Sequence, residues 1–225
     1  MSILDSSDGK SANASERIVA SLREEILSGR IPPGTALRQE QIAEQFGASR
    51  LPVREALRVL TEQGLLTKRT NAGAHVAVLD LHACVVIYSI REAIEPLAFA
   101  ESVSNLPKAA IDRLIEIQNL IEAGVSIEEY LRLDREFHLT TYSGGSMDYL
   151  QGLVSNLWDM TDHYRRLFVG LTDPSKEWRI NFEHRFIIDS IQRNDAREGG
   201  QVISNHIRRT RDQLSVHPEL FIPRA

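Results

Sequence analysis

The apolar residues of this chain repeat with helical spacing almost from end to end, and one short stretch changes the period. Ile18, Leu22 and Ile26 recur every four residues, which is one face of an amphipathic helix. Residues 65–69 and 74–78 instead form two short β-prone runs. The chain is therefore expected to be mainly α-helical, with a single two-stranded hairpin.

Three helices separated by turn residues precede the hairpin, whose turn is Asn71-Ala72-Gly73. Gly29 and the Pro32-Pro33-Gly34 turn end the first helix, because no helix crosses a proline pair. Gly47 ends the second helix, and Ser49 is placed to cap a third helix that stops at Gly64. The apolar faces of the second and third helices are formed by Leu37, Ile42, Ala43 and Phe46, and by Val53, Ala56, Leu57 and Leu60.

The third helix carries a stripe of arginines. Arg50, Arg54 and Arg58 stand four residues apart, away from the apolar face. Such a helix fits the DNA major groove, where arginine bonds guanine bidentately or holds phosphate. The alternative is a solvated face with local ion pairs, for example from Arg54 or Arg58 to Glu62. The net charge of −5 does not oppose DNA binding, because residues 1–78 carry +1 and residues 79–225 carry −6.

The segment PGTALRQEQIAEQFGASRLPVREALRVLTEQGLLTKRTNAGAHV resembles the winged helix-turn-helix of GntR-family transcription regulators over about 60 residues. The positions that match are Pro33, Gly34, Leu37, Ala43, Ser49, Arg50, Pro52, Val53, Arg54, Glu55, Ala56, Leu57, Leu60, Gly64 and Leu65. The resemblance implies that Arg50 and Arg54 contact operator bases or phosphates and that Arg38 contacts the DNA backbone. The full set assigned to DNA is Arg38, Ser49, Arg50, Arg54, Arg58 and Gly73. Relatives often have Arg or Lys before the wing glycine, where this chain has Ala72, so wing contacts fall to His75, Lys68 or Arg69.

After Val78 the pattern is helical to the end of the chain. The apolar repeats cover residues 83–103, 109–121, 127–142, 148–169, 178–193 and 196–216. Ser126 opens a capping box, Asp173-Pro174 is a helix start, and Asn194-Asp195 forms a turn. About six helices in roughly 145 residues are enough for an all-α domain with its own core.

Four side chains of this domain have the spacing and chemistry of metal ligands. Asp134 and His138 lie at i and i+4, so they leave one helix on the same face. His184 and His206 lie on two later helices. Carboxylate and neutral imidazole suit zinc or another divalent transition metal, and side chains from three helices could close a site inside a bundle. The alternatives are a surface ion pair and histidines that are packed or exposed singly.

The same domain resembles the FCD ligand-sensing domain of FadR-type GntR regulators over about residues 79–215. The segments that match are VIYSIREAIEPLAFAESV, LDREFH and NFEHRFIIDSIQRNDAREGGQVISNHI. The resemblance implies a metal held by Asp134, His138, His184 and His206, with a small carboxylic acid as effector. It also implies that Arg91 points into the effector cavity, whereas an ion pair with Glu95 is the alternative. Weaker candidates for the cavity are Arg135, Tyr142, Trp158, Arg165, Asn181 and Arg185.

The domains expected are a flexible tail over 1–13, a winged helix-turn-helix over 14–78, an all-helical metal, effector and dimerisation domain over 79–217, and a tail over 218–225. The protein is expected to be a homodimeric regulator, a repressor type, that reads a pseudo-palindromic operator. Zinc is the preferred metal, with nickel, manganese or iron as alternatives. A constitutive DNA-binding protein with a structural metal and, less favoured, a metal-dependent enzyme stay open. One cysteine, no export signal and no long apolar run indicate a cytoplasmic protein without a membrane span.

Overall fold

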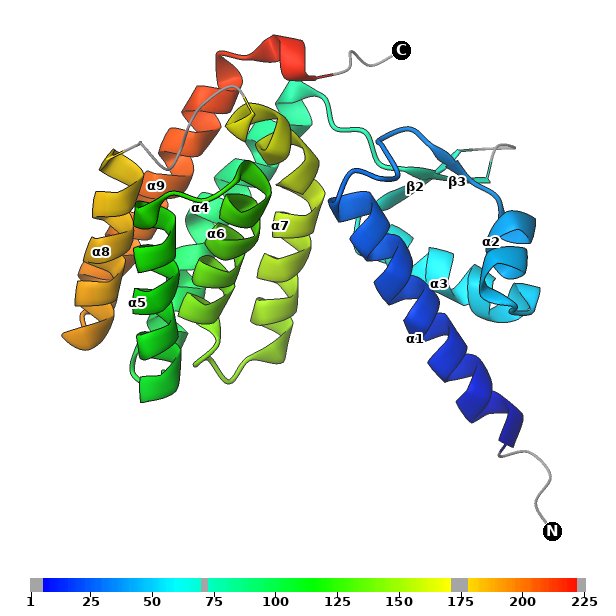
Figure 1. The fold of residues 1–225 in the computed structure, drawn as a ribbon, viewed down its shortest axis with the longest axis horizontal. Helices are drawn as coiled ribbons and strands as arrows, with labels where there is room; N and C mark the ends of the chain where they lie inside the picture. Colours follow the sequence, from blue (N-terminus) through cyan, green and yellow to red (C-terminus); the bar gives the residue numbers. More distant parts are fainter. Residues whose placement is uncertain (1–5, 70–72, 171–177, 222–225) are drawn as a thin grey trace. The chain divides into compact units, whose positions relative to one another are not determined.

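The computed structural model describes residues 6–69, 73–170 and 178–221, and the chain divides into two compact units, Met1–Val78 and Leu79–Ala225 (Figure 1). The first unit contains three helices and a small sheet, and the second is helical throughout its described residues. This is the mainly α architecture that the apolar spacing predicts. Asn71-Ala72 of the predicted hairpin turn and the predicted helix start Asp173-Pro174 lie outside the described residues.

The first unit packs three helices around one core. The helices are α1 (Ser6–Leu27), α2 (Gln39–Phe46) and α3 (Arg50–Glu62), and the strands are β1 (Ala36–Leu37), β2 (Leu66–Arg69) and β3 (Gly73–Val76). The predicted apolar faces of α1 and α3 meet in this core, where Ile18, Leu22, Val53 and Leu60 are almost completely buried. Gly47 ends α2 in the left-handed conformation, with a φ of 57°.

Helix α1 begins at Ser6, inside the segment 1–13 that is expected to be a flexible tail. A helix that is already nucleated gains one hydrogen bond for each residue it adds, so a polar segment can extend it without apolar contacts. Residues 1–5 lie outside the described part of the chain.

The predicted two-stranded hairpin is also incomplete, since the sheet has three strands in the order β1-β3-β2. Ala36 pairs with His75 and Leu37 with Ala74, so Leu37 belongs to a strand and not to the second helix. The N–H of Gly34 donates to the carbonyl of Val76, and the N–H of Val76 donates to the carbonyl of Thr35. Strand β1 therefore supplies hydrogen-bond partners to the backbone along the second edge of β3. Its two residues are too few to show the alternation of apolar and polar side chains by which a strand is predicted.

The second unit contains the six helices that the sequence predicts, and they form a bundle (Figure 1). They are α4 (Leu81–Val103), α5 (Lys108–Ala123), α6 (Ile127–Tyr142), α7 (Asp148–Val169), α8 (Trp178–Gln192) and α9 (Ala196–Ser215). The side chain of Ser126 accepts a hydrogen bond from the Glu129 N–H, as a capping box requires. Asn194 takes the left-handed conformation, with a φ of 56°, and Asp195 caps α9.

The first residues of the tail expected over 218–225 have a defined structure. Pro218–Leu220 form a 3-10 turn, and Phe221 is buried with its ring stacked on Tyr164, the ring centres 4.9 Å apart. Burial of an aromatic ring fixes these residues onto α7. Residues 222–225 lie outside the described part of the chain.

Helix α9 approaches α4 so closely that one of two adjacent glycines has no space for a side chain. A Cβ at Gly199 would lie 2.3 Å from the Phe99 ring, and that ring is completely buried. A Cβ at Gly200 would meet Pro96 at an ordinary 3.5 Å. We expect Gly199→Ala to destabilise the unit by about 1–3 kcal/mol through overpacking. Gly200→Ala is expected to be neutral or stabilising by up to about 1 kcal/mol through helix propensity.

Urea unfolding of the two variants beside the unsubstituted protein measures this difference. Equal midpoints for Gly199→Ala and the unsubstituted protein would show that Phe99 has room to move.

Within the described residues, no helix is both long enough and apolar enough to cross a membrane.

Candidate functional site

The arginine stripe lies on the solvent side of α3. Arg50, Arg54 and Arg58 are all exposed, whereas Val53 and Leu57 on the opposite side are buried. Arg54 makes no hydrogen bond or ion pair with any residue that the structure describes. Its guanidinium is therefore available to a base or a phosphate.

The other two arginines of the stripe are held by carboxylates of the same unit. Arg58 binds both Glu55 and Glu62 along the helix, which is the local ion pairing considered as the alternative for this face. An amino group of Arg50 lies 3.3 Å from a carboxylate oxygen of Glu40 on α2. All five side chains remain exposed, so these pairs are weak and exchangeable.

The remaining residues assigned to DNA stand at the ends of the same elements. Arg38 is the residue before α2 and Ser49 the residue before α3, and both are exposed. Ser49 occupies the predicted cap position, but its hydroxyl makes no capping hydrogen bond. Helix N-termini attract phosphate, so both positions are suited to a DNA backbone.

The wing residue Gly73 is exposed at the start of β3, with a φ of 79°. A hollow between α3 and the wing is lined by Gln39, Arg54, Arg58, Lys68 and Gly73, among others. The stripe and the wing thus border one concave surface.

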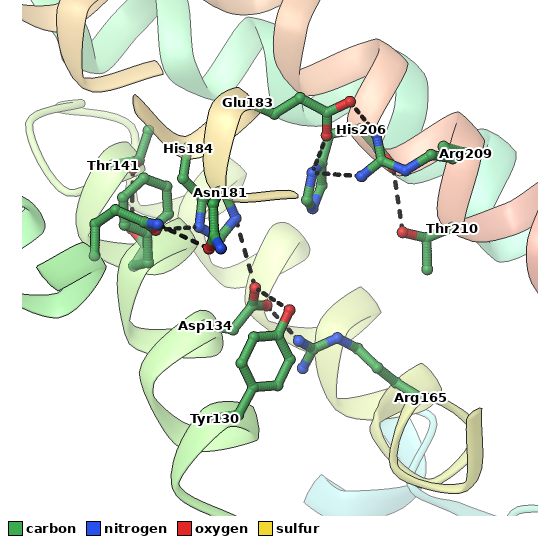
Figure 2. Close-up of polar contacts among 12 residues, drawn as sticks. Tyr130, Asp134, Thr141, Arg165, Asn181, Glu183, His184, His206, Arg209 and Thr210 are labelled. Atoms are coloured by element: carbon green, nitrogen blue, oxygen red, sulfur yellow. Dashed lines mark hydrogen bonds and ion pairs between the residues drawn. The ribbon is translucent and has the colours of Figure 1, made fainter. Parts of the chain in front are cut away.

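The four predicted metal ligands converge in the core of the second unit. Figure 2 shows three of them, Asp134, His184 and His206. Asp134 and His138 come from α6, His184 from α8 and His206 from α9. One ligand atom from each lies within 4.8 Å of the others, and all four side chains are buried. The packing of the helices therefore brings together residues that are far apart in the sequence, from 134 to 206.

His184 and His206 each have a hydrogen-bond partner at Nδ1, and the Nε2 of His184 lies 3.6 Å from an Asp134 carboxylate oxygen. The Nδ1 of His184 lies 2.8 Å from the side-chain amide oxygen of Gln118, and the Nδ1 of His206 lies 2.8 Å from a carboxylate oxygen of Glu183. These contacts leave each Nε2 for a ligand bond, which is how an outer partner orients a metal-binding imidazole. The Nε2 of His184 and both ring nitrogens of His138 are buried without a hydrogen-bond partner among the described residues. Buried nitrogens without partners are costly unless an ion takes them, so the cluster fits a bound metal.

The protonation states of Asp134, His138 and His184 are those that a metal requires. Burial lowers the pKa of His184 to about 3 and that of His138 well below its ordinary value, so both rings are neutral. Burial opposes the ionised form of Asp134, but Arg165 together with His138, His184 and His206 outweighs it, so the pKa of Asp134 lies below its ordinary value. A carboxylate and neutral imidazoles are together the donor set of zinc, nickel, manganese or iron sites.

Two arginines, Arg165 and Arg209, lie beside the cluster. Arg165, from α7, forms a buried ion pair with Asp134, and the Tyr130 hydroxyl lies 3.3 Å from the same carboxylate (Figure 2). A small cavity of about 40 Å³ opens here, lined by Asp134, Arg165, His206 and Arg209, among others. A carboxylate placed in this cavity would meet both a guanidinium and the metal cluster.

Arg91 makes the ion pair with Glu95 that is the alternative to an effector-binding role for this residue. Its Nε lies 2.6 Å from the carboxylate, and both side chains are buried. The Tyr142 hydroxyl donates to the other oxygen of Glu95 at 2.7 Å, and the Arg91 guanidinium lies over the Trp158 ring. Arg91 is thus fixed by its neighbours on α6 and α7.

The residues that orient the histidines were not found from the sequence. Gln118 comes from α5, and Glu183 immediately precedes a ligand on α8 and also binds Arg209. Arg165 appeared there only among weaker candidates. Of the others, Arg185 pairs with Glu122 outside the cluster and Arg135 pairs with Asp159.

Two family models match this chain. The model of bacterial regulatory proteins of the gntR family matches residues 14–76, and the FCD domain model matches residues 86–209. The second match alone covers more than half of the chain.

Curated relatives match over most of their length. The chain is 28% identical over 190 residues to the gluconate operon transcriptional repressor of Bacillus subtilis (strain 168), covering 82% of this chain and 78% of that protein. It is 25% identical over 197 residues to the transcriptional repressor RspR of Escherichia coli (strain K12), covering 85% of each.

Solved structures show the same fold. The Escherichia coli protein McbR/YncC aligns with a TM-score of 0.74 at 21% identity, covering 89% of this chain and 96% of that chain. A transcriptional regulator of the GntR family from Pseudomonas syringae aligns with a TM-score of 0.55 at 28% identity, covering 92% and 88%.

Proposed function

From the premise that this chain belongs to the gntR family of bacterial regulatory proteins and carries an FCD domain, we propose that a small carboxylic acid controls its affinity for operator DNA. As a member of this family the protein is a DNA-binding transcriptional regulator. The acid binds at a divalent metal ion held by Asp134, His138, His184 and His206. Zinc is the first choice, with nickel, manganese and iron as alternatives.

The observation that carries the proposal is the buried cluster itself. Four ligand atoms from three helices lie within 4.8 Å of one another, and three buried ring nitrogens have no hydrogen-bond partner among the described residues. When bound, the ion supplies positive charge to which a carboxylate can attach. The chain supplies Arg165 beside the cavity, and the family resemblance adds Arg91 as a second candidate cation for the acid.

Regulators of this family usually act as dimers, and we propose the same for this chain. A dimer would place two α3 helices on a pseudo-palindromic operator, with Arg38, Ser49, Arg50, Arg54, Arg58 and Gly73 as the contacting residues. An acid that binds one arrangement of the dimer better than another would shift operator affinity by that difference.

The test is a DNA titration under defined metal. Operator fragments are first selected by the protein from a random-sequence pool, and binding is then measured with zinc-loaded and chelator-treated protein against a panel of small mono-, di- and tricarboxylic acids. We expect at least one acid to change the affinity for DNA, and only in the metal-loaded protein.

Two other outcomes decide against acid control. Unfolding of the second unit by chelation, with no acid changing DNA affinity, would show a structural metal in a constitutive regulator. Chemical conversion of a bound acid would instead support the enzymatic alternative.

A further inference from the structure

We propose that an ion pair at the surface of the second unit, between Glu122 and Arg185, sets which ring nitrogen of His184 binds the metal. The pair acts through the buried side chain of Gln118, so all three are positioning residues and not ligands. The inference deepens the proposed function, and it rests on that function for the metal itself.

The ring of His184 is fixed from several sides. It is completely buried and stacks on the ring of Phe137, with the ring centres 4.2 Å apart. Its Nε2 lies 3.6 Å from a carboxylate oxygen of Asp134, and its Nδ1 lies 2.8 Å from the side-chain oxygen of Gln118. A neutral imidazole has one N–H and one lone pair, so Nε2 binds an ion only while the proton is on Nδ1. The group that faces Nδ1 therefore decides whether the ring is ready for the metal.

The orientation of the Gln118 amide follows from what surrounds its nitrogen. Gln118 is completely buried. Its amide nitrogen lies 3.0 Å from a carboxylate oxygen of Glu122 and 3.0 Å from the side-chain oxygen of Asn181. An ionised carboxylate only accepts hydrogen bonds, so the amide nitrogen must face Glu122 and the amide oxygen must face His184. That oxygen accepts from an N–H, which keeps the proton on Nδ1 and the lone pair on Nε2.

Arg185 holds the Glu122 carboxylate in place. Its Nε donates to one carboxylate oxygen at 2.9 Å and its Nη2 donates to the other at 2.6 Å, which is the bidentate contact of a guanidinium with a carboxylate. The same Nη2 donates to the side-chain oxygen of Asn119 at 2.8 Å. The side chains of Glu122 and Arg185 are 36% and 37% exposed, so the pair adds little stability. Its effect is on orientation, because a fixed carboxylate beside Gln118 excludes the reversed amide.

The contrast with His206 shows why His184 needs this additional pair. The Nδ1 of His206 lies 2.8 Å from a carboxylate oxygen of Glu183. A carboxylate has no N–H to present, so it favours the proton on Nδ1 whichever of its oxygens faces the ring. The amide of Gln118 could present either its oxygen or its nitrogen to His184. The choice between them is made one helical turn further along α5, by Glu122.

The first test measures the affinity for zinc by competition with a coloured chelator. Gln118→Leu removes the acceptor at Nδ1 and is expected to weaken zinc binding by about ten- to a hundredfold. Gln151→Leu is the matched control, the same change at a partly buried glutamine of α7 that binds the Gly145 carbonyl, and it is expected to leave the affinity unchanged. Circular dichroism checks that both variants are folded.

The second test reverses the ion pair. The double variant Glu122→Arg with Arg185→Glu keeps opposite charges together but sets a hydrogen-bond donor beside Gln118. The amide oxygen then turns to that donor and the amide nitrogen turns to His184, so the proton moves to Nε2. We expect zinc affinity to fall by at least about tenfold. The control is Lys108→Asp with Asp112→Lys, which reverses an exposed pair of α5 and is expected to have no effect.

Nitrogen NMR of protein labelled at histidine gives a readout that a merely structural role would not move. The spectra are recorded after chelator treatment, and the signals of His184 are assigned by their loss in His184→Asn. The proton is expected on Nδ1 in the unsubstituted protein and on Nε2 in the variant with the reversed Glu122 pair.

The outcomes separate this inference from acid control of DNA binding. An unsubstituted protein that binds no zinc overturns both the positioning role and the metal of the proposed function. Unchanged zinc affinity in Gln118→Leu and in the reversed Glu122 pair overturns the positioning role and leaves acid control standing. Affinity that is lost in Gln118→Leu but kept in the reversed pair overturns the part assigned to Glu122 and Arg185.

Discussion

Replacing His138 with alanine is expected to lower the affinity of the protein for its metal by at least about a hundredfold, since even an outer partner of a metal ligand contributes ten- to a hundredfold. His138 is the ligand with both ring nitrogens buried and without a hydrogen-bond partner among the described residues. Elemental analysis of the purified variant should find less than a tenth of the metal found in the unsubstituted protein.

Thermal unfolding gives an independent measure of the same loss. A metal that binds only the folded state raises stability with its concentration, so added zinc should raise the midpoint of the unsubstituted protein and leave that of His138→Ala unchanged. His163→Ala, at a partly buried histidine of α7 outside the cluster, is the matched control and should respond to zinc like the unsubstituted protein. One tightly held ion per chain in His138→Ala would refute the assigned ligand set.

Arg54→Ala should weaken operator binding by roughly 5- to 150-fold, which corresponds to about 1–3 kcal/mol for a guanidinium that reads a base. The expectation follows from the position of Arg54, exposed in the middle of α3 and without an ion pair among the described residues. Binding of the variant to operators with single base changes should also be less selective at one position. Fluorescence anisotropy at two salt concentrations measures both effects.

Arg58→Ala is the natural comparison, because it lies one helical turn away on the same stripe. Its guanidinium already binds Glu55 and Glu62, so its removal is expected to weaken operator binding less than Arg54→Ala and to leave base preference unchanged. Equal losses in the two variants would show that the carboxylates release Arg58 on the DNA. Undiminished binding of Arg54→Ala would remove the base-reading role from this residue.

The helices of the second unit could be predicted from the sequence because their punctuation is explicit. Ser126, Asn194 and Asp195 each act at the turn where local chemistry places them. Strand β1 could not be predicted, since two residues carry no periodicity and their pairing depends on a free edge of β3. The start of α1 was missed for a related reason, because its polar first turns lack the apolar repeat on which the prediction depends.

Some residues of the candidate site could likewise be predicted from the sequence, and others could not. Asp134 and His138 share a helix face, so their pairing follows from spacing. His184 and His206 were candidates by residue type, and the family resemblance implied that they join that pair. Gln118 and Glu183 could not be predicted, because their contacts with the histidines depend on how α5, α8 and α9 pack. The ion pair of Arg165 with Asp134 likewise depends on the placement of α7 against α6.

The carboxylates that hold Arg50 and Arg58 have a consequence for how the protein searches a chromosome. Phosphates of any sequence must compete with Glu40, Glu55 and Glu62 for these guanidiniums, so we expect contacts with random DNA to be weakened. A short dwell time at each wrong site lets a few copies of a regulator scan many positions. We therefore expect the carboxylates of α2 and α3 to reduce non-specific binding to DNA, and discrimination between sequences to depend on Arg54.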